Sequence, residues 1–292
     1  MRLIIRIAAL GVTLAIVAGF AGRVHPVGDS FAAFRLHLAG AAVILWAVSA
    51  LSGLVRAEKL TGLAACLALG SILYSAWLPL PATPAGGVTV LQHNVLWRNE
   101  RLDQMIAQIT AADADIVLLQ EPVPNRTERL RELAPYTEHL VCGAGAMSNH
   151  LLLSRLPVLA SGCVQQAGWM QVQTALGPVT FVSVHLRWPW PYSQPIDLDV
   201  LVPLFESLPR PMVVAGDFNS AKWSEAVARI AAASDTIPVS GLRLTFADPR
   251  FWPGLPIDHV LMPEGWVGTA RMLNAAGSDH RATLATMGPP AQ

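Results

Sequence analysis

The sequence predicts an α/β (α+β) domain, a four-layer sandwich of two packed mixed β-sheets flanked by helices, preceded by an N-terminal three-helix membrane segment. Two observations lead to this prediction. The first 80 residues contain three long apolar runs, each about as long as a helix that crosses a bilayer. From residue 88 onward, short apolar runs typical of buried strands outnumber helical patterns and do not alternate strictly with them. This pattern favours two packed sheets.

Composition differs between the two parts. The chain has 292 residues, of which 14% are charged, well below the usual fraction of about 25%. The first 80 residues hold six bases and two acids, which leaves 14 of the chain's 20 bases and 18 of its 20 acids to the remainder. That remainder is acidic and has a single lysine, Lys222. Because nucleic-acid binding needs a basic face, nucleic acid is the less favoured partner.

The three apolar runs predict three transmembrane helices, at about residues 3–21, 37–55 and 60–80. The first run has an alternative interpretation as a cleavable signal peptide, because Arg2 and Arg6 precede it and small residues end it. The other two runs have an alternative as buried core helices, although uncharged runs of this length are rare in soluble domains.

Charge predicts the orientation of these helices. With the N-terminus inside, the inner flanks carry four bases and the outer link carries two. The positive-inside rule then puts everything after Leu80 outside. We therefore expect a multi-pass protein of a bacterial-type inner membrane whose following domain is periplasmic or extracellular. The predicted division is a membrane segment at 1–80, a Pro/Gly linker at 81–87, a domain at 88–287 and a tail at 288–292.

The elements of the second part follow from its periodicity. Predicted strands lie at 88–92, 115–121, 136–142, 150–154, 161–173, 178–186, 213–217, 257–262 and 281–286, and predicted helices lie near 99–109, 126–133, 197–208 and 224–233.

Polar residues gather where these strands end. They are Asn94, Glu121, His185, Asp217, Asn219, Asp258, Asp279 and His280. Each one alone is more often a turn or core residue. Asp217 and Asn219 are two positions apart, so in extended structure both side chains face one side. The joint pattern indicates a single polar site.

The order of short motifs around these residues resembles the endonuclease/exonuclease/phosphatase superfamily, which has the DNase I-like fold. The motifs are Gln92-His93-Asn94, Leu119-Gln120-Glu121, Leu152-Leu153-Ser154-Arg155-Leu156-Pro157, Val184-His185-Leu186, Gly216-Asp217-Phe218-Asn219, Ile257-Asp258-His259 and Ser278-Asp279-His280. The resemblance covers residues 88–287 and implies a metal-dependent phosphoesterase. It leaves the substrate open, because the family includes nucleases, sphingomyelinases and inositol phosphatases.

The resemblance also implies a metal site. Glu121 is the expected first ligand, with Asn94 and Asp279 nearby. Mg²⁺ prefers oxygen ligands and keeps several waters, so one or two carboxylates suffice. Mg²⁺ is the expected cofactor, with Mn²⁺ as the alternative.

Further roles are implied by the resemblance. Asp217 would orient or deprotonate the attacking water, and Asn219 would bond a phosphoryl oxygen or Asp217. His280 would be the general acid/base or a cation facing the developing charge, with Asp258 as its partner. His185 would donate to a non-bridging oxygen.

Two pairs of residues, two histidines and two cysteines, lie near the motifs without an expected catalytic role. His93 and His259 are expected to point away from the site, since side chains alternate along strands. Cys142 and Cys163 would pair if the domain lies outside the cytoplasm, or remain two free buried thiols.

Aromatic residues favour a lipid substrate. Trp188, Trp190 and Tyr192 follow His185 and are expected at the rim of the substrate site, where they suit interfacial contact or an apolar tail. The favoured hypothesis is a membrane-anchored phosphoesterase acting outside the cytoplasm on a lipid-linked phosphate, such as a polyprenyl pyrophosphate or a phospholipid or sphingolipid headgroup, with membrane lipids as partners. The alternatives are a membrane-tethered endonuclease or exonuclease, and a catalytically silent interaction module.

Overall fold

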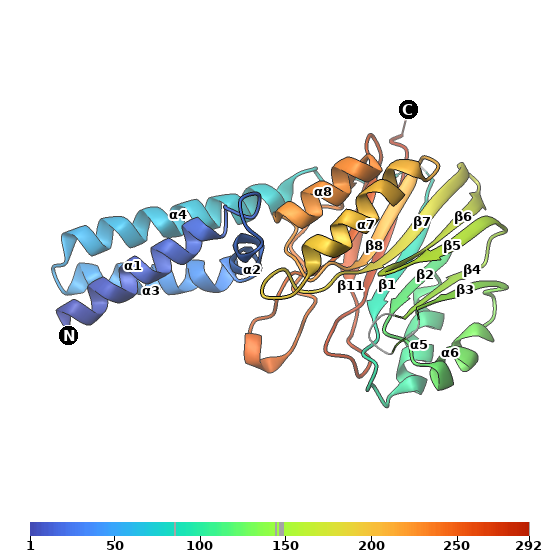
Figure 1. Cartoon of the computed structure of the whole chain (residues 1–292), viewed down its shortest axis with the longest axis horizontal. Helices are drawn as coiled ribbons and strands as arrows, with labels where there is room; N and C mark the ends of the chain where they lie inside the picture. The colour runs from blue at the N-terminus through green and yellow to red at the C-terminus, as the bar shows by residue number, and fades with distance from the viewer. Residues whose placement is uncertain (85, 144, 146–148, 292) are drawn as a thin grey trace.

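The computed structural model describes residues 1–84, 86–143, 145 and 149–291. An N-terminal bundle of helices lies beside a sandwich of two β-sheets that carries helices on its outer faces (Figure 1). Residue 85 of the predicted linker and residue 292 of the predicted tail lie outside the described residues.

The bundle is made of α1 (Arg2–Ala18), α2 (Val27–Ala33), α3 (Arg35–Leu51) and α4 (Val55–Trp77). The three long helices pack against one another, and α2 lies at the end nearest the sandwich (Figure 1). Their contact is built mostly from small residues, among them Ala39, Ala42 and Ala68, which let helix backbones approach closely. Many large apolar side chains therefore remain on the outside of the bundle.

The prediction of three membrane-spanning helices is not supported as it was made. Among the described residues, α4 alone is long and apolar enough to span a bilayer. The bent pair α2 and α3 would make a second span only if the two helices, which meet at 69°, are counted together. The first helix stops at Ala18 instead of residue 21, and the third stops at Leu51 instead of residue 55. At the start of α3, Arg35 Nη2 donates to the Gly19 carbonyl at 2.6 Å. With 17 residues each, α1 and α3 are about 25 Å long.

The first sheet has six strands in the order β11-β12-β1-β2-β4-β3, and the second has six in the order β5-β6-β7-β8-β10-β9. The strands of the first sheet are β1 (Val88–Asn94), β2 (Ile116–Gln120), β3 (Glu138–Cys142), β4 (His150–Ser154), β11 (Val267–Met272) and β12 (Thr283–Gly288). The strands of the second are β5 (Val158–Val164), β6 (Ala167–Thr174), β7 (Gly177–His185), β8 (Met212–Asp217), β9 (Thr236–Pro238) and β10 (Asp258–Pro263). Both sheets are mixed, since β1–β2 and β7–β8 are parallel pairs and the other pairs are antiparallel.

Helices complete the four layers. They are α5 (Leu102–Ala112), α6 (Pro124–Arg131), α7 (Gln194–Ser207) and α8 (Glu225–Ser234), with a short 3₁₀ helix η1 (Pro249–Phe251). One apolar cluster fills the space between the sheets, a second lies under α7 and α8, and a third lies under α5. The predicted sandwich of two packed mixed sheets flanked by helices is confirmed.

The sandwich differs from the predicted elements in three places, one of which is the three-residue strand β9, which was not predicted. The predicted strand at 161–173 is a hairpin of β5 and β6, which turns at Gln166 with a φ of 66°. The sequence offers no Gly or Pro at the turn itself. The strand β11 is missing from the prediction because it is an edge strand on which Gly268 alone is buried. It therefore lacks the alternating apolar pattern that identifies a strand.

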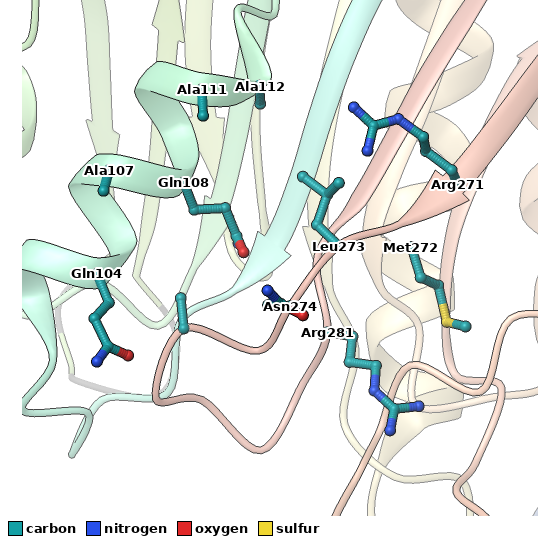
Figure 2. Close-up of a pocket in the computed structure, with 11 residues that line it drawn as sticks. Gln104, Ala107, Gln108, Ala111, Ala112, Arg271, Met272, Leu273, Asn274 and Arg281 are labelled. Atoms are coloured by element: carbon teal, nitrogen blue, oxygen red, sulfur yellow. The ribbon is translucent and has the colours of Figure 1, made fainter.

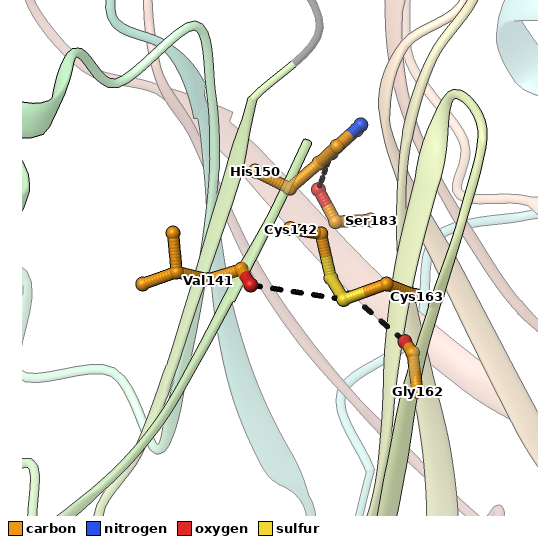
Figure 3. The surroundings of a disulfide bond; sticks show 6 residues. All are labelled: Val141, Cys142, His150, Gly162, Cys163 and Ser183. Atoms are coloured by element: carbon orange, nitrogen blue, oxygen red, sulfur yellow. Dashed lines mark hydrogen bonds between the residues drawn. A yellow bond between two sulfur atoms is a disulfide. The ribbon is translucent and has the colours of Figure 1, made fainter. Parts of the chain in front are cut away.

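A disulfide bond joins Cys142 and Cys163 (Figure 3). Cys142 ends β3, at one edge of the first sheet, and Cys163 lies on β5, at one edge of the second. The bond therefore connects the two sheets of the sandwich. Of the two alternatives left open by the sequence, the structure contains the paired cysteines.

Candidate active site

Strand register brings the predicted polar residues to one end of the sandwich. In the first sheet, Asn94 at the end of β1 lies beside Gln120 at the end of β2. In the second sheet, Asp217 of β8 lies between His185 of β7 and Asp258 of β10. Because the carboxyl ends of parallel strands share one sheet edge, each sheet contributes its polar group to the same end of the molecule.

Asn94 joins the two sheets at this end. Its Nδ2 donates to Glu121 Oε1 at 3.0 Å and to Asp217 Oδ2 at 3.1 Å. His185 Nε2 lies 3.7 Å from each of the same two oxygens. All four residues are buried. Two carboxylates from different sheets are therefore held within reach of one amide and one imidazole.

Backbone conformation sets two of these positions. Glu121 adopts a φ of 62° immediately after β2, which turns its side chain out of the strand direction. Gly216 precedes Asp217 and lies so close to β7 that a Cβ would collide with the Val184 carbonyl oxygen. Only glycine fits at this point, so the Gly-Asp pair of the motif has a packing reason.

His280 is held by a buried carboxylate. Its Nδ1 donates to Asp258 Oδ2 at 2.8 Å, and its Nε2 lies 3.7 Å from Asp217 Oδ2. Burial alone would lower the pKa of His280, but the Asp258 and Asp217 carboxylates reverse this and raise the pKa to about 10. Burial would raise the pKa of Asp258, and its contacts with His280 lower it instead. This pair is therefore an imidazolium and a carboxylate at neutral pH.

Asp217 has the opposite tendency. Burial, followed by repulsion from Asp258, raises the pKa of Asp217 to about 6, against the attraction of His280 and His185. Its Oδ1 accepts a hydrogen bond from the Asn219 backbone N–H at 2.8 Å, and its Oδ2 faces Asn94 and His280. A carboxylate whose pKa lies just below neutrality is suited to take a proton from water.

A chain of buried side chains runs from Asp258 into the space between the sheets. Gln92 Nε2 donates to Asp258 Oδ1 at 2.9 Å and to Gln120 Oε1 at 3.0 Å. Gln120 Nε2 donates to Ser183 Oγ at 2.9 Å, and Ser183 Oγ bonds His150 Nδ1 at 2.9 Å (Figure 3). All five residues have no measurable exposure. The chain fixes the Asp258 carboxylate on the side that His280 does not contact.

The donor set at this site fits a divalent cation with oxygen ligands. Asp279 Oδ1 is buried without a hydrogen-bond partner, and it lies 3.9 Å from His280 Nε2. Glu121 has both oxygens engaged by neutral N–H donors, from Asn94 and from the Trp97 backbone, and the imidazole of His185 lies 3.7 Å from Oε1. Carboxylate oxygens are the usual ligands of Mg²⁺.

A second set of possible ligands is Asp217, Asp258 and His280, whose ligand atoms lie within 4.8 Å of one another. The 2.8 Å bond between His280 Nδ1 and Asp258 Oδ2 already engages two of these groups, and the raised pKa of His280 opposes metal binding by its ring. The hydrogen bond makes Asp258 and His280 an orienting pair.

Asn94 and Asn219 each donate a hydrogen bond to a carboxylate of this group. Asn219 contacts Asp217 through its backbone N–H, while its Nδ2 donates to the Leu186 carbonyl at 2.8 Å. Asn94 presents Nδ2 to the carboxylates, and its Oδ1 accepts from the Leu96 N–H at 3.1 Å. Asn94 would bind a cation through Oδ1 only if the amide turned over.

The two other histidines beside the motifs lie outside this group of contacts. His93 Nε2 bonds the His280 carbonyl oxygen at 3.0 Å, and His259 Nε2 bonds the Ser220 carbonyl oxygen at 2.8 Å. Both rings are buried and, mainly for that reason, their pKa values are lowered to about 4. They support the backbone of the catalytic segments.

The predicted rim residues follow β7 and differ in exposure. Trp188 is partly buried, whereas Trp190 is 50% and Tyr192 is 63% exposed. The Trp190 backbone N–H and carbonyl both bond Ser30 Oγ in the bundle. The rim therefore lies where the sandwich meets the N-terminal helices.

Several residues that support the site were not predicted as functional. Gln92 and Gln120 orient Asp258, Ser278 Oγ bonds both the Asn94 carbonyl and the His280 N–H, and the Phe246 ring lies 4.9 Å from the His280 ring. The sequence could have indicated the two glutamines, because each is a polar residue that follows apolar residues in a buried strand. Nothing local in the sequence indicated Phe246.

One cavity lies away from these groups. It has a volume of about 1000 Å³ and lies between α5 and the segment around Leu273 and Asn274 (Figure 2). Its polar lining includes Gln104, Gln108 and Arg271. Because it contains none of the carboxylates or the imidazoles described above, we do not assign the chemistry to it.

Known proteins are similar to this chain in sequence and in fold. A model of the Endonuclease/Exonuclease/phosphatase family matches residues 91–280. A UPF0294 protein of Vibrio vulnificus strain CMCP6 is 28% identical over 228 residues, covering 70% of this chain and 78% of the relative.

Solved structures agree with the family match. An endonuclease/exonuclease/phosphatase from Bacteroides vulgatus has a TM-score of 0.58 and 19% identity, over 70% of this chain and 99% of that one. D. rerio TDP2 with a single-strand DNA product has a TM-score of 0.55 and 16% identity, also over 70% and 99%. At such identities the likeness shows the fold alone.

Proposed function

The chain belongs to the endonuclease/exonuclease/phosphatase family and is a phosphoric ester hydrolase, and we propose that it is a Mg²⁺-dependent phosphoesterase acting on a lipid-linked phosphoester or pyrophosphate. The carrying observation is the placement of Asp217 Oδ2 between Asn94 Nδ2 at 3.1 Å and His280 Nε2 at 3.7 Å, beside Glu121. One base, one imidazolium and one further carboxylate therefore meet at the place where we propose that the phosphoryl group binds.

The side chains divide the hydrolysis among them. Asp217 orients the attacking water and accepts its proton, which its pKa of about 6 permits at neutral pH. His280, fixed by Asp258, presents N–H from Nε2 to the oxygens on which negative charge develops. His185 donates to a non-bridging oxygen from the other side of Asp217. A divalent cation held by Glu121, with Asp279 and a turned Asn94 nearby, supplies neutralisation of phosphoryl charge.

We propose that residues 1–80 are a membrane segment, residues 81–87 a linker and residues 88–287 the catalytic domain. Support comes from the outward apolar side chains of the bundle. Leu3, Ile7, Leu10, Leu14 and Leu73 are each more than 50% exposed, and water is an unfavourable environment for so continuous an apolar surface. Helices of 17 residues are at the lower limit for a bilayer span, so α1 and α3 are proposed to span together with α4.

Charge and the disulfide support a location outside the cytoplasm. The helices α1 and α4 both begin at the end of the bundle away from the sandwich (Figure 1). Their first turns carry Arg2, Arg6, Arg56 and Lys59, and Arg6 and Arg56 line one pocket there. By the positive-inside rule this end is cytoplasmic. The disulfide between Cys142 and Cys163 suits an oxidising compartment. The substrate is then a phosphate group at the outer membrane surface.

The metal dependence is tested with the full-length protein in detergent and a chromogenic phosphodiester. Wild type should lose hydrolysis in EDTA and recover it with Mg²⁺. Glu121→Gln should raise the Mg²⁺ concentration for half-activation at least tenfold, because it removes the main ligand charge. Glu138→Gln, at an exposed glutamate of β3, is the matched control. Hydrolysis that persists in EDTA, or an unchanged Mg²⁺ requirement in Glu121→Gln, would contradict the proposal.

A further inference from the structure

Residues of α2 and of the start of α3 contact three separate segments of the sandwich domain. Asp29 accepts hydrogen bonds from the Glu225 and Ala226 N–H groups at 2.9 and 3.0 Å, at the start of α8. The Ala32 carbonyl accepts from Trp223 Nε1 at 2.9 Å. These contacts fix α2 against the helix that follows Asp217.

The same helix also holds the segment that follows His185. Ser30 Oγ donates to the Trp190 carbonyl at 3.0 Å and accepts from the Trp190 N–H at 3.1 Å. Immediately after α2, the Phe34 ring lies 6.1 Å from the Trp188 ring. The bend between α2 and α3 is therefore seated on the rim.

The third segment is η1, which precedes β10. The Phe34 ring lies 5.8 Å from the Phe251 ring, and His37 Nε2 donates to the Phe251 carbonyl at 3.0 Å. Phe251 in turn contacts Phe246 at 5.7 Å, and Phe246 contacts His280 at 4.9 Å. Aromatic surface is thus continuous from the bend of the bundle to the catalytic imidazole.

Phe34, Trp188 and Phe251 form a cluster that we call the aromatic junction. Each of its side chains is partly exposed, and the surrounding Trp190 and Trp252 are 50% and 82% exposed. Apolar surface held in place by the hydrogen bonds of Ser30, Asp29 and His37 loses little conformational freedom when it takes a ligand. The junction is thus preorganised for an apolar group that lies next to a phosphate.

We propose that the aromatic junction is a specificity subsite that binds the apolar, non-reacting part of a phosphoester whose phosphate lies at Asp217 and His280. The N-terminal segment then contributes Phe34 directly to substrate selection, in addition to any role as an anchor. This inference rests on the proposed phosphoesterase function.

The test uses two substrates that differ only in their apolar group, methyl p-nitrophenyl phosphate and octyl p-nitrophenyl phosphate. For the wild-type full-length protein, kcat/KM should be about tenfold higher for the octyl ester, because burying even part of the chain favours binding. Phe34→Ala should remove this preference by raising KM for the octyl ester. The kcat for the octyl ester and the kcat/KM for the methyl ester should not change. Phe34→Trp should restore it.

Phe31→Ala is the matched control, because Phe31 lies on α2, is 37% exposed and makes no ring contact among the described residues. Phe31→Ala should keep the octyl preference. Because the octyl ester partitions into detergent equally in all assays, a comparison between variants is not affected by that partition. An octyl preference equal in wild type and Phe34→Ala would overturn the inference.

The design separates this inference from the proposed function. Methyl ester hydrolysis that is lost in His280→Ala supports the phosphoesterase function whatever Phe34 does. The affinity of octyl phosphate relative to inorganic phosphate, measured by calorimetry, tests the subsite without turnover. A ratio that falls about tenfold in Phe34→Ala supports the subsite, and an unchanged ratio contradicts it.

Discussion

The sandwich and the helical bundle treat apolar and polar side chains in opposite ways. In the sandwich, Phe181, Phe205 and Phe218 are fully buried, and buried polar groups gather at the strand ends, where they contact one another. In the bundle, the core is made mostly of alanines, and large apolar residues such as Leu14 and Leu73 face outward. Its buried Asp29 contacts the sandwich instead of a neighbouring polar side chain.

This difference indicates what each part needs from its surroundings. The sandwich buries its large apolar side chains between and beneath its sheets. Its polar cluster lies at the strand ends, which is the arrangement of a site for a charged substrate. The bundle leaves large apolar side chains exposed and contacts the sandwich through its buried Asp29. The first part is suited to chemistry and the second to an apolar environment.

The largest expected effect concerns the polar cluster. His280→Ala should lower kcat for a phosphodiester by about 10³-fold, because general acid/base groups contribute about 10²- to 10⁴-fold. His139→Ala, at an exposed histidine of β3, should leave kcat unchanged. If His280→Ala retained most of its activity while folded by circular dichroism, the cluster would not be the catalytic centre.

The next prediction separates the two apolar surfaces. Leu14→Arg places a charge on the outward face of α1, where insertion would cost about 3 kcal/mol at mid-membrane. The fraction of protein recovered with membranes should fall. Leu159→Arg is matched in exposure, at 53% against 58% for Leu14, but lies in the sandwich. Equal recovery of both variants would mean that the bundle does not meet lipid.

A smaller effect concerns pH. Burial, followed by repulsion from His185, lowers the pKa of His150 from 6.5 to about 3. The unfolded state therefore binds the proton more readily, so the stability that His150 contributes is complete above about pH 6.5 and is lost as the pH falls toward 3. His150→Gln should reduce the loss of unfolding free energy between pH 7 and pH 4.5 by on the order of 2 kcal/mol.

Urea unfolding at the two pH values, followed by tryptophan fluorescence, measures this difference. His139→Gln, which changes an exposed histidine, should behave like wild type. If the unfolding free energy of His150→Gln fell between pH 7 and pH 4.5 by as much as that of the wild type, His150 would not titrate between these pH values.

The smallest effect concerns the support of Asp258. Gln92→Leu removes a 2.9 Å hydrogen bond to Asp258 Oδ1, so we expect kcat to fall about tenfold with KM unchanged, as for one lost hydrogen bond to a charged group. Gln173→Leu changes an exposed glutamine of β6 and should have no effect. A change in KM alone would place Gln92 in substrate binding instead of positioning.

Much of the sandwich and its site could be predicted because both depend on local patterns. Buried strands have short apolar runs as their sequence pattern. Residues at the strand ends, such as Asp217 and Asp258, lie side by side when the strands pair. The exposed edge strand β11 carries no such pattern, and the side-chain direction of Asn219 depends on the Leu186 carbonyl, 33 residues away.

The role of the bundle could be predicted only in part. Apolar runs indicated its helices, but the ends of α1 and α3 are set by Arg35 and Gly19 in contact across the bundle. The docking of α2 joins Ser30 to Trp190 and Phe34 to Phe251, residues far apart in the sequence. Such contacts between distant parts of the chain cannot be predicted from the local periodicity of the sequence.

The most direct test of the account is hydrolysis by the full-length protein in detergent with Mg²⁺, beside His280→Ala, on a panel of a polyprenyl pyrophosphate, phospholipids, a sphingomyelin and plasmid DNA, with the products of each substrate identified. We expect turnover of at least one lipid that is lost in His280→Ala and depends little on salt. Cleavage of DNA alone, weakening steeply as salt rises, would instead show a nuclease and contradict the lipid-linked substrate.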